Sequence, residues 1–467
     1  MQLTTFYKTI LYSCFILSTA FFTTSCKKFL EPDYKTQVTK DVVFTNDANA
    51  QAAIAGLYST MATITVFNGE ITRMAGFASD ELNYYTSNVS FDQFQNNQLL
   101  ASNSNVQGIW DNYYKVIYQC NAIIENSEAS AGMTDAFKTQ LIGEARFLRA
   151  FCHFYLVNFF GPVPLITATA KEITANAPRN TVEEVYTQMK ADLTGAMSAL
   201  PGDYAISGSK RIRANKWAAA ALLARVYLYT KDWSNAEAMA TAVLANTGLY
   251  SLQTAADINN VFLKNNSESI LEWDRTPLGA AYEGSLFQSW FNYFGYFDHT
   301  ILPTLVNSFD STDLRKANWI KIASTASGPY KYKSTSGNTE NYLVLRVAEQ
   351  YLIRAEARAQ QNNISGAKSD INVIRNRAGL ASDTTMVNKT TAMAAIENER
   401  RHELFCEWGH RWFDLKRWPS LTSPATKTRA DDVLGALKTT WKSTAILFPV
   451  PQTARDANPE LTQNEGY

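Results

Sequence analysis

Residues of the types that carry out chemistry are most concentrated between Ile396 and Trp418, in the run IENERRHELFCEWGHRWFDLKRW. His402, Cys406 and His410 recur every four residues, so they would share one face of a helix, which is a possible spacing for metal ligands. The zinc-protease pattern HExxH is incomplete, because Cys406 occupies the position of its second histidine. Since no other clustered Cys or His offers a fourth ligand, we interpret the run as structural and predict no metal site and no cofactor.

No enzyme motif accompanies these residues. The chain has no P-loop, no G-x-S-x-G elbow and no G-x-G-x-x-G fingerprint. A glycosidase would need two carboxylates that face one cleft, and the sequence cannot pair the many that are present. We therefore expect a non-catalytic protein and keep a glycan-cleaving enzyme as a remote alternative. Lys plus Arg and Asp plus Glu number 43 each, so no excess of basic charge predicts a nucleic-acid partner.

The charged run itself predicts one helix with an apolar stripe. Glu397 stands four residues before Arg401, and Glu407 four before Arg411, an order in which each pair stabilises a helix by about 0.2–0.5 kcal/mol. Pro419 ends the predicted helix, since proline cannot continue it. The stripe consists of Leu404, Phe405, Trp408 and Trp412.

The N-terminus has the pattern of a targeting segment. Lys8 precedes an apolar run, Ile10–Phe22, that is short for a membrane span. Small residues then lead to Cys26, which looks like a lipoprotein processing site. Residues 1–25 would be removed, Cys26 would be lipidated, and residues 26–45 would form a tether to the membrane. An ordinary secretory signal with an incidental cysteine is the alternative.

Three cysteines remain beyond Cys26, namely Cys120, Cys152 and Cys406. An odd number without a close pairing pattern argues against a scaffold built on disulfides. Their aromatic neighbours predict that all three are small buried residues.

Helical patterns come in pairs along the body of the chain. The predicted helices cover residues 107–127, 134–158, 181–200 and 214–230. The segments 217–250 and 343–380 carry small residues at the spacing of a tetratricopeptide unit of about 34 residues. Such units bury their apolar faces only against neighbours, so we expect several to stack. An unrelated helical bundle is the alternative.

Other stretches interrupt the helical pattern. Residues 62–105 are polar and irregular, which is typical of a binding loop. Residues 251–342 and 420–467 are predicted to be loop-dominated, with a short strand at Ser269–Trp273. The predicted fold class is therefore mainly α, with tetratricopeptide-like helix pairs and loop-rich, aromatic insertions.

Two motifs in this order resemble the SusD/RagB family. The charged run ends in W-F-D-L-K-R-W, and the chain closes with LFPVPQ, then Asn458-Pro459 and QNEGY. The resemblance covers the mature chain and divides it into a SusD-like N-terminal half, 46–250, and a SusD/RagB C-terminal half, 251–467. It implies an outer-membrane lipoprotein, exposed at the cell surface, that binds oligosaccharides without cleaving them.

The resemblance also implies partners. The captured glycan would pass to a SusC-like TonB-dependent transporter in the outer membrane, while the lipid on Cys26 holds the protein there. Some members of the family bind peptides, so a RagB-like peptide-binding protein of the same fold is the alternative.

The ligand-contacting residues of the family vary, so the resemblance gives the site only by region. The regions are the loop after the tetrapeptide ASDE at 78–81 and the aromatic segment 285–297. Aromatic rings there can stack on the apolar faces of sugars while polar groups bind the hydroxyls. The predicted ligand-binding residues are the rings Trp290, Tyr293, Tyr296, Tyr84 and Tyr85, and the polar residues Asp80, Asn83 and Asn292. Phe287, Phe291 and Phe294 are assigned to the core, because their rings lack a polar group.

Overall fold

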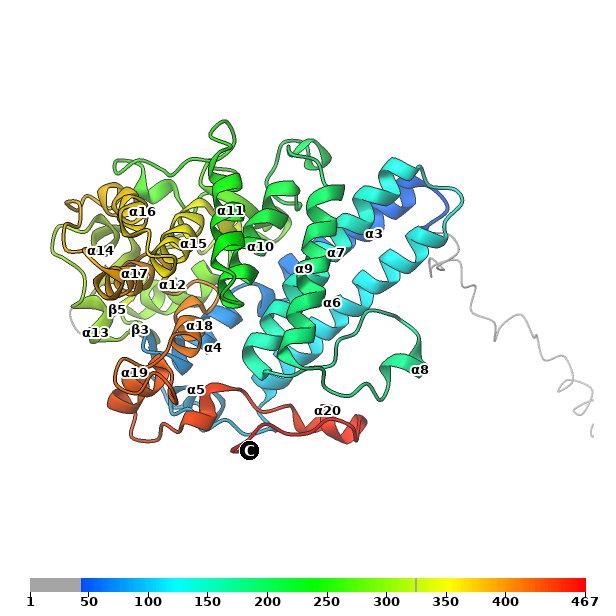
Figure 1. The fold of residues 1–467 in the computed structure, drawn as a ribbon. Coiled ribbons are helices and arrows are strands. Elements are labelled where there is room, and N and C mark those ends of the chain that lie inside the picture. The colour runs from blue at the N-terminus through cyan, green and yellow to red at the C-terminus, as the bar shows by residue number, and fades with distance from the viewer. Residues whose placement is uncertain (1–42, 324–325) are drawn as a thin grey trace, which may run out of the picture.

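Helices form most of the molecule in the computed structural model, which describes residues 43–323 and 326–467 (Figure 1). The helices of the first half are α3 (Asp47–Thr63), α4 (Glu70–Ala78), α5 (Val89–Gln95), α6 (Ser104–Ala129), α7 (Asp135–Phe160), α8 (Lys171–Thr174), α9 (Val182–Ala199), α10 (Lys216–Tyr229) and α11 (Trp233–Leu244). Those of the second half are α12 (Tyr282–Phe294), α13 (Pro303–Val306), α14 (Leu314–Trp319), α15 (Val347–Gln360), α16 (Ile364–Arg377), α17 (Lys389–Leu404), α18 (His410–Arg417), α19 (Arg429–Leu437) and α20 (Gln452–Ala457). The mainly helical prediction is confirmed.

Polar residues begin several helices and so satisfy their free N–H groups. The Asn46 side chain accepts a hydrogen bond from the Asn49 N–H (2.9 Å) at the start of α3. Thr181 and Glu184 form a capping box at the start of α9, each side chain accepting from the backbone N–H of the other. Gly161, with φ +72°, ends α7 where the sequence Gly-Pro predicts a stop.

Consecutive helices pack side by side in an array that confirms the predicted helix pairs. α6 packs on α7, α7 on α9, α9 on α10 and α10 on α11, and the array continues directly from α11 to α15, α16 and α17 (Figure 1). Arg225 on α10 and Glu349 on α15 form a buried ion pair of 2.6 Å within this array. The two predicted tetratricopeptide-like segments are therefore neighbours in space, although about a hundred residues separate them in sequence.

The insertion between α11 and α15 leaves the array and returns to it. It contributes strands to three small antiparallel sheets, ordered β1-β3, β2-β6 and β4-β5. The strands are β1 (Leu82–Tyr84), β2 (Ser269–Trp273), β3 (His299–Ile301), β4 (Ile320–Ile322), β5 (Ser327–Pro329) and β6 (Tyr342–Arg346). β2 confirms the predicted strand. The pairing of β1 with β3 sets Tyr84 opposite His299, and thereby joins the insertion to the segment after α4.

Residues 62–105 are not the irregular loop that their composition predicted. They contain α4, β1 and α5, and Phe77 and Phe94 in these helices are fully buried. Their polar residues serve the helices instead. Asn88 accepts from two N–H groups at the start of α5, and Asn103 does the same at the start of α6. Side chains that cap helices give a stretch a loop-like composition, which explains the wrong prediction.

The predicted single helix over residues 396–418 is also wrong. α17 ends at Leu404 and α18 begins at His410. Between them, Cys406, Trp408 and Gly409 have φ values of +50°, +49° and +74°, in the left-handed region. Such a conformation is costly for residues other than glycine, and it persists where surrounding contacts compensate for the strain.

The ion pairs expected within that helix do not form either. Arg401 and Arg411 both contact Asp80, at 2.7 Å each. Glu407 contacts Lys331 and Arg346 instead. Several ion pairs of this run therefore join distant parts of the chain, whereas Asp414 and Arg417 pair within α18 at 2.8 Å.

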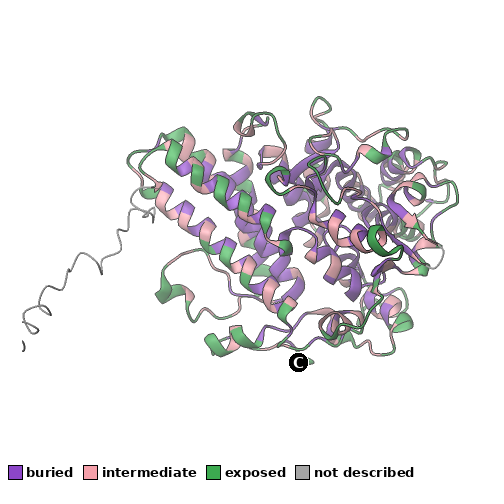
Figure 2. Cartoon of the chain, turned by 180° about the vertical axis from the view of Figure 1, so that it is seen from behind, coloured by how far each residue is buried: buried purple, intermediate pink, exposed green. Residues whose placement is uncertain are grey.

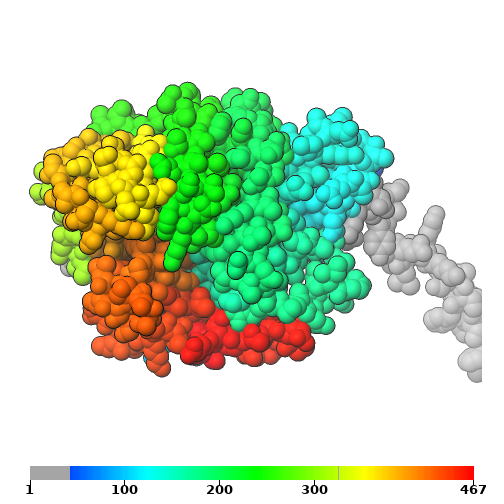
Figure 3. All heavy atoms as spheres, viewed as in Figure 1, coloured from blue at the N-terminus to red at the C-terminus, as the bar shows by residue number. Residues whose placement is uncertain are grey.

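Buried residues fill the middle of the molecule, where the helices face one another (Figure 2). Cys120, Cys152 and Cys406 are buried and free, as their aromatic neighbours predicted. The C-terminal segment lies against residues of the N-terminal half along one edge of the molecule (Figure 3). Asn464 in its QNEGY ending donates to the Phe160 carbonyl (2.9 Å), so this ending fixes the terminus to α7.

Candidate ligand-binding site

Five aromatic side chains gather at the surface where α12 ends beside β1. We call them the aromatic surface: Tyr85, Trp290, Tyr293, Phe294 and Tyr296. Tyr85 is 70% exposed, Tyr293 82%, Phe294 63% and Tyr296 36%, while Trp290 is half-buried. Contiguous exposed apolar groups on a folded protein commonly mark a surface that binds something.

The rings form one connected group. Tyr296 links its two parts, because its ring centroid lies 5.8 Å from that of Tyr85 and 5.8 Å from that of Trp290. Phe294 lies 5.0 Å from Trp290 and 6.4 Å from Tyr293. These separations are the usual ones for paired aromatic rings. The planes are tilted against one another by 32–54°, so the surface is a twisted ridge and not a flat platform.

Two local features bring these rings together. α12 ends because Gly295 takes φ +76°, and the Gly295 N–H donates to the Phe291 carbonyl. This left-handed turn directs the chain from α12 back toward β3. The Tyr85 N–H then donates to the Asp298 carbonyl (2.7 Å), which extends the β1-β3 pairing by one residue and places Tyr85 beside Tyr296.

The polar residues predicted to bind the ligand lie in different environments. Asn83 on β1 and Asn292 on α12 are exposed, on the same two elements that carry the rings. Tyr84 is half-buried, and its ring packs against Phe91 and His299, each at 5.0 Å between centroids. Because side chains alternate along a strand, Tyr84 faces the protein while its neighbours face solvent.

Asp80 is buried and lies between two guanidinium groups. Its carboxylate accepts from Arg411 through Nε and Nη2, at 2.7 and 3.1 Å, and contacts Arg401 Nη2 at 2.7 Å. Burial raises the pKa of the Asp80 carboxyl, but the charges of Arg411 and Arg401 outweigh burial and hold this pKa below its ordinary value. The structure therefore places Asp80 in an ion-pair cluster, whereas the aromatic surface consists of residues of α12 and of the segments that follow α12 and β1.

Phe294 was assigned to the core, and the structure contradicts this. Phe287 is buried and Phe291 half-buried, but Phe294 is 63% exposed within the aromatic surface. Gly295 is the signal that could have indicated it, since the last residue of a helix often projects beyond the packed face. Lys321, whose Nζ lies 3.9 Å from the centroid of the Phe291 ring, is a further neighbour that sequence reasoning missed.

Most charged side chains of residues 396–418 pair with opposite charges in the interior. Glu403 contacts Arg346 at 2.6 Å, Arg315 at 3.0 Å and also Arg377. Burial raises the pKa of the Glu403 carboxyl, but the three arginines outweigh it and hold the pKa well below the ordinary value. A carboxylate so fully paired holds elements together and is not available for proton transfer.

His402, Cys406 and His410 do not share a helical face, because the chain breaks between α17 and α18. His402 Nε2 lies 2.8 Å from Ser308 Oγ, and its ring stacks on Phe309 at 4.1 Å between centroids. Among the residues that the structure describes, no group of three His, Cys, Asp or Glu side chains is arranged to hold a metal ion.

Known protein families match most of this chain. A family described as "Starch-binding associating with outer membrane" matches residues 28–228, and one described as "SusD family" matches residues 308–467. A SusD-like protein of Bacteroides ovatus is 26% identical over 86% of this chain and 81% of its own length. A SusD-like protein of Formosa agariphila is 24% identical over 99% of this chain and 98% of its own length. Across residues 43–323 and 326–467, none of the helices has both the length and the apolar character needed to cross a bilayer.

Solved structures share the fold. A SusD homolog of Bacteroides thetaiotaomicron superposes with a TM-score of 0.77 at 22% identity, covering 93% of this chain and all of the other. A protein described as a laminarin binding SusD-like protein superposes with a TM-score of 0.72 at 24% identity, covering 89% of this chain and 99% of the other.

Proposed function

Because this chain belongs to the SusD family of starch- and glycan-binding proteins associated with the outer membrane, we propose that it captures oligosaccharides at the cell surface and passes them to a SusC-like TonB-dependent transporter. Membership of this family makes it a binding protein and not an enzyme. The transporter as partner, the cell-surface position and the lipid anchor on Cys26 belong to the proposal. Cys26 lies outside the described residues.

One observation carries the proposal, namely the aromatic surface. Its rings come from two segments more than 190 residues apart in sequence, namely Tyr85 and residues 290–296. The rings contact one another at the surface, where they are exposed to solvent. Three of these side chains are 63–82% exposed, so they bury little apolar area and add little to the stability of the core. A ligand that covers the rings would gain that burial on binding.

A glycan suits this surface. Each sugar presents an apolar C–H face that can stack on a ring and hydroxyl groups that need polar partners. The tyrosine hydroxyls and the exposed amides of Asn83 and Asn292 lie on the same elements and can supply those partners. The printed description of one structural neighbour as laminarin binding makes a β-glucan a reasonable first probe.

The experiment is a glycan array followed by titration calorimetry of the best ligand against Trp290→Ala and Tyr293→Ala. By analogy with a base stacked on an aromatic ring, loss of one stacking ring should weaken binding by about 1–3 kcal/mol, which is roughly tenfold to a hundredfold in Kd. Tyr293 is 82% exposed and Trp290 half-buried, so we expect Tyr293→Ala to leave the melting temperature unchanged and Trp290→Ala to lower it slightly.

Tyr118→Ala is the matched control, because Tyr118 on α6 is 47% exposed and is not part of the aromatic surface. It should bind the glycan as the parent does. Full binding by both Trp290→Ala and Tyr293→Ala would show that the ligand lies elsewhere. If the protein binds no glycan but binds peptides from a library through the same rings, the ligand is a peptide and not a glycan.

A further inference from the structure

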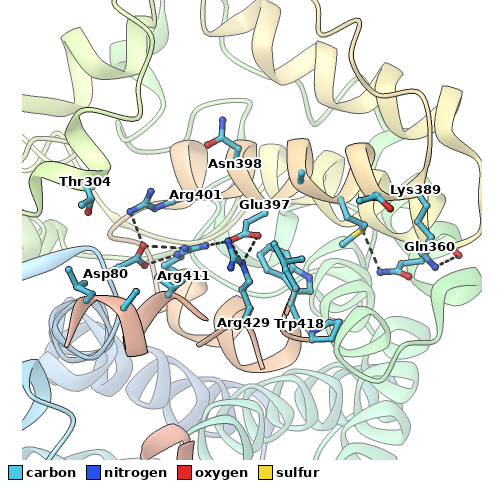
Figure 4. Close-up of a pocket in the computed structure, with 18 residues that line it drawn as sticks. Asp80, Thr304, Gln360, Lys389, Glu397, Asn398, Arg401, Arg411, Trp418 and Arg429 are labelled. Carbon is cyan, nitrogen blue, oxygen red and sulfur yellow. Dashed lines mark hydrogen bonds and ion pairs between the residues drawn. The ribbon is translucent and has the colours of Figure 1, made fainter. Parts of the chain in front are cut away.

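A cavity separate from the aromatic surface lies between α17 and the segment that runs from the end of α18 to α19 (Figure 4). Its volume is about 970 Å³, within the range of pockets that hold small ligands. No residue of the aromatic surface lines it. The cavity therefore has no role in the proposed binding of glycans by the rings, and its function has to be inferred separately.

A row of alternating charges forms one wall of the cavity (Figure 4). Asp80 is shared by Arg401 and Arg411, at 2.7 Å each, and Glu397 is shared by Arg411 and Arg429, at 3.1 and 3.0 Å. Three guanidinium groups thus line the cavity with two carboxylates between them. Asp432, 3.2 Å from Arg429, compensates only the end of the row that lies farthest from Arg401.

Arg401 is the least satisfied member of the row. A guanidinium carries five N–H donors, yet in the described part of the chain Arg401 contacts one carboxylate, through Nη2, and that carboxylate is shared with Arg411. Its side chain remains 14% exposed. Lys389 also lines the cavity, and its Nζ has a single carbonyl partner, Gln360, at 3.4 Å. Positive charge and unused donors therefore remain at this wall, and a carboxylate is, with phosphate, one of the two groups that match a guanidinium in geometry and charge.

The other walls are neutral and partly apolar. Met393, Ala394, Val433 and Leu437 provide aliphatic surface, while Asn398 and Thr390 provide amide and hydroxyl groups without a role in the ion pairs. A ligand that fits both kinds of wall has a carboxylate attached to a hydroxylated body with apolar C–H faces.

We propose that this cavity is a second ligand site, which takes a uronate, that is, a sugar whose carboxylate contacts Arg401. The site is separate from the aromatic surface, and the two can be tested independently. The carboxylate would displace water from donors that the fold leaves unused, without breaking the pairs that Asp80 and Glu397 already form.

Titration calorimetry of the full-length protein tests this with two trisaccharides, trigalacturonate and the neutral maltotriose. Ala394→Trp places a bulky ring in part of the cavity, from the exposed face of α17 and away from the buried ion pairs. Ala55→Trp, at an exposed position of α3 that does not line the cavity, is its matched control. Arg401→Gln removes the charge, and Trp290→Ala removes part of the aromatic surface.

Trigalacturonate should bind the parent protein at least about tenfold more tightly than maltotriose does, the effect of one charged hydrogen bond. Ala394→Trp and Arg401→Gln should lose this binding, while Ala55→Trp and Trp290→Ala keep it. If Arg401→Gln fails to fold, Ala394→Trp still decides the question. Equal binding of the two trisaccharides, or unchanged uronate binding in Ala394→Trp, would overturn the proposal. Loss of uronate binding in Trp290→Ala would also overturn it, by assigning the uronate to the aromatic surface.

Discussion

Asp80 shows how much one residue can hold together in this fold. It lies just after α4, and its carboxylate connects that helix to Arg401 on α17 and Arg411 on α18. The side chain is buried, so water cannot replace the carboxylate if it is lost. Removing one partner of a buried charge cluster leaves the remaining charges uncompensated.

We therefore predict that Asp80→Asn lowers the free energy of unfolding by about 3–5 kcal/mol, as found when one partner of a buried ion pair is removed. Urea denaturation followed by circular dichroism measures this. Glu460→Gln is the control, because it removes the charge of an exposed carboxylate. Its effect on the free energy of unfolding should stay within about 0.5 kcal/mol. A similar small effect for both variants would contradict the structural role of Asp80.

Glu283 is a buried acid that predicts a pH dependence. Its Oε1 accepts from the Tyr342 hydroxyl (2.8 Å), and burial raises the pKa of the carboxyl to about 8. In the unfolded chain this pKa is about 4.3. The folded state therefore holds the proton more tightly, and the stability that the protonated acid contributes is lost as pH rises through the interval from about 4.3 to 8.

Glu283→Gln keeps the shape of the protonated acid but cannot ionise. We expect its melting temperature to equal that of the parent protein near pH 4.5 and to exceed it increasingly up to about pH 8, where the difference levels off. Differential scanning calorimetry at intervals of pH checks this. A difference that stays constant with pH would assign the effect to packing and not to titration.

Among the secondary-structure elements, the break between α17 and α18 positions the buried Trp408. The Trp408 N–H donates to Thr72 Oγ1 (3.0 Å) and its indole N–H to the Leu343 carbonyl (2.6 Å). A continuous helix would direct this ring elsewhere. The left-handed residues of the break are thus compensated by contacts with α4 and β6.

Gly409 makes this break testable. A Cβ at this position would lie 2.8 Å from the Ala75 Cβ, and its φ of +74° is unfavourable for other residues. We expect Gly409→Ala to reduce the free energy of unfolding by about 1–3 kcal/mol. Gly435→Ala is the matched control, since Gly435 lies inside α19 with no contact closer than 3.5 Å. That change should be neutral or stabilise by about 0.5–1 kcal/mol.

In the molecule as a whole, the helical array forms the packed framework and the insertion carries most of the aromatic surface. The array runs without interruption from α6 to α17, so the insertion can vary its surface without disturbing the packing of α11 on α15. The aromatic surface is carried by the insertion and by the segment after α4, outside the array. Such a division lets one helical framework present different surfaces to ligands.

The anchoring of the whole molecule is a further prediction, for residues that the structure does not describe. Cys26→Ala should release the protein from the outer-membrane fraction, because the acyl chains on this sulfur would be its attachment. Immunoblots of fractionated cells measure this. Cys14→Ala is the control, because Cys14 would be removed with the signal and the variant should stay in the membrane fraction. If the Cys26→Ala protein still fractionates with the outer membrane on its own, the anchor lies elsewhere in the chain.

Elements that have local causes could be predicted from the amino-acid sequence. The helices of the array and the strand at Ser269–Trp273 follow from apolar spacing and from β-branched or aromatic composition, which act over a few residues. The two terminal motifs also indicated the family correctly. Candidate residues of the site could be chosen by type, since rings with polar groups suit a wet surface.

How these elements meet depends on contacts that form in the folded chain. The break after Leu404 depends on partners such as Thr72, more than 300 residues away, which outweigh the helical preference of the local sequence. Tyr85 and Tyr296 meet because β1 pairs with β3, and Phe294 is exposed because Gly295 ends α12 beside them. The pairing of strands, the left-handed backbone of the break and the buried ion pairs all depend on contacts between distant residues. Patterns within a short stretch of sequence cannot predict such contacts.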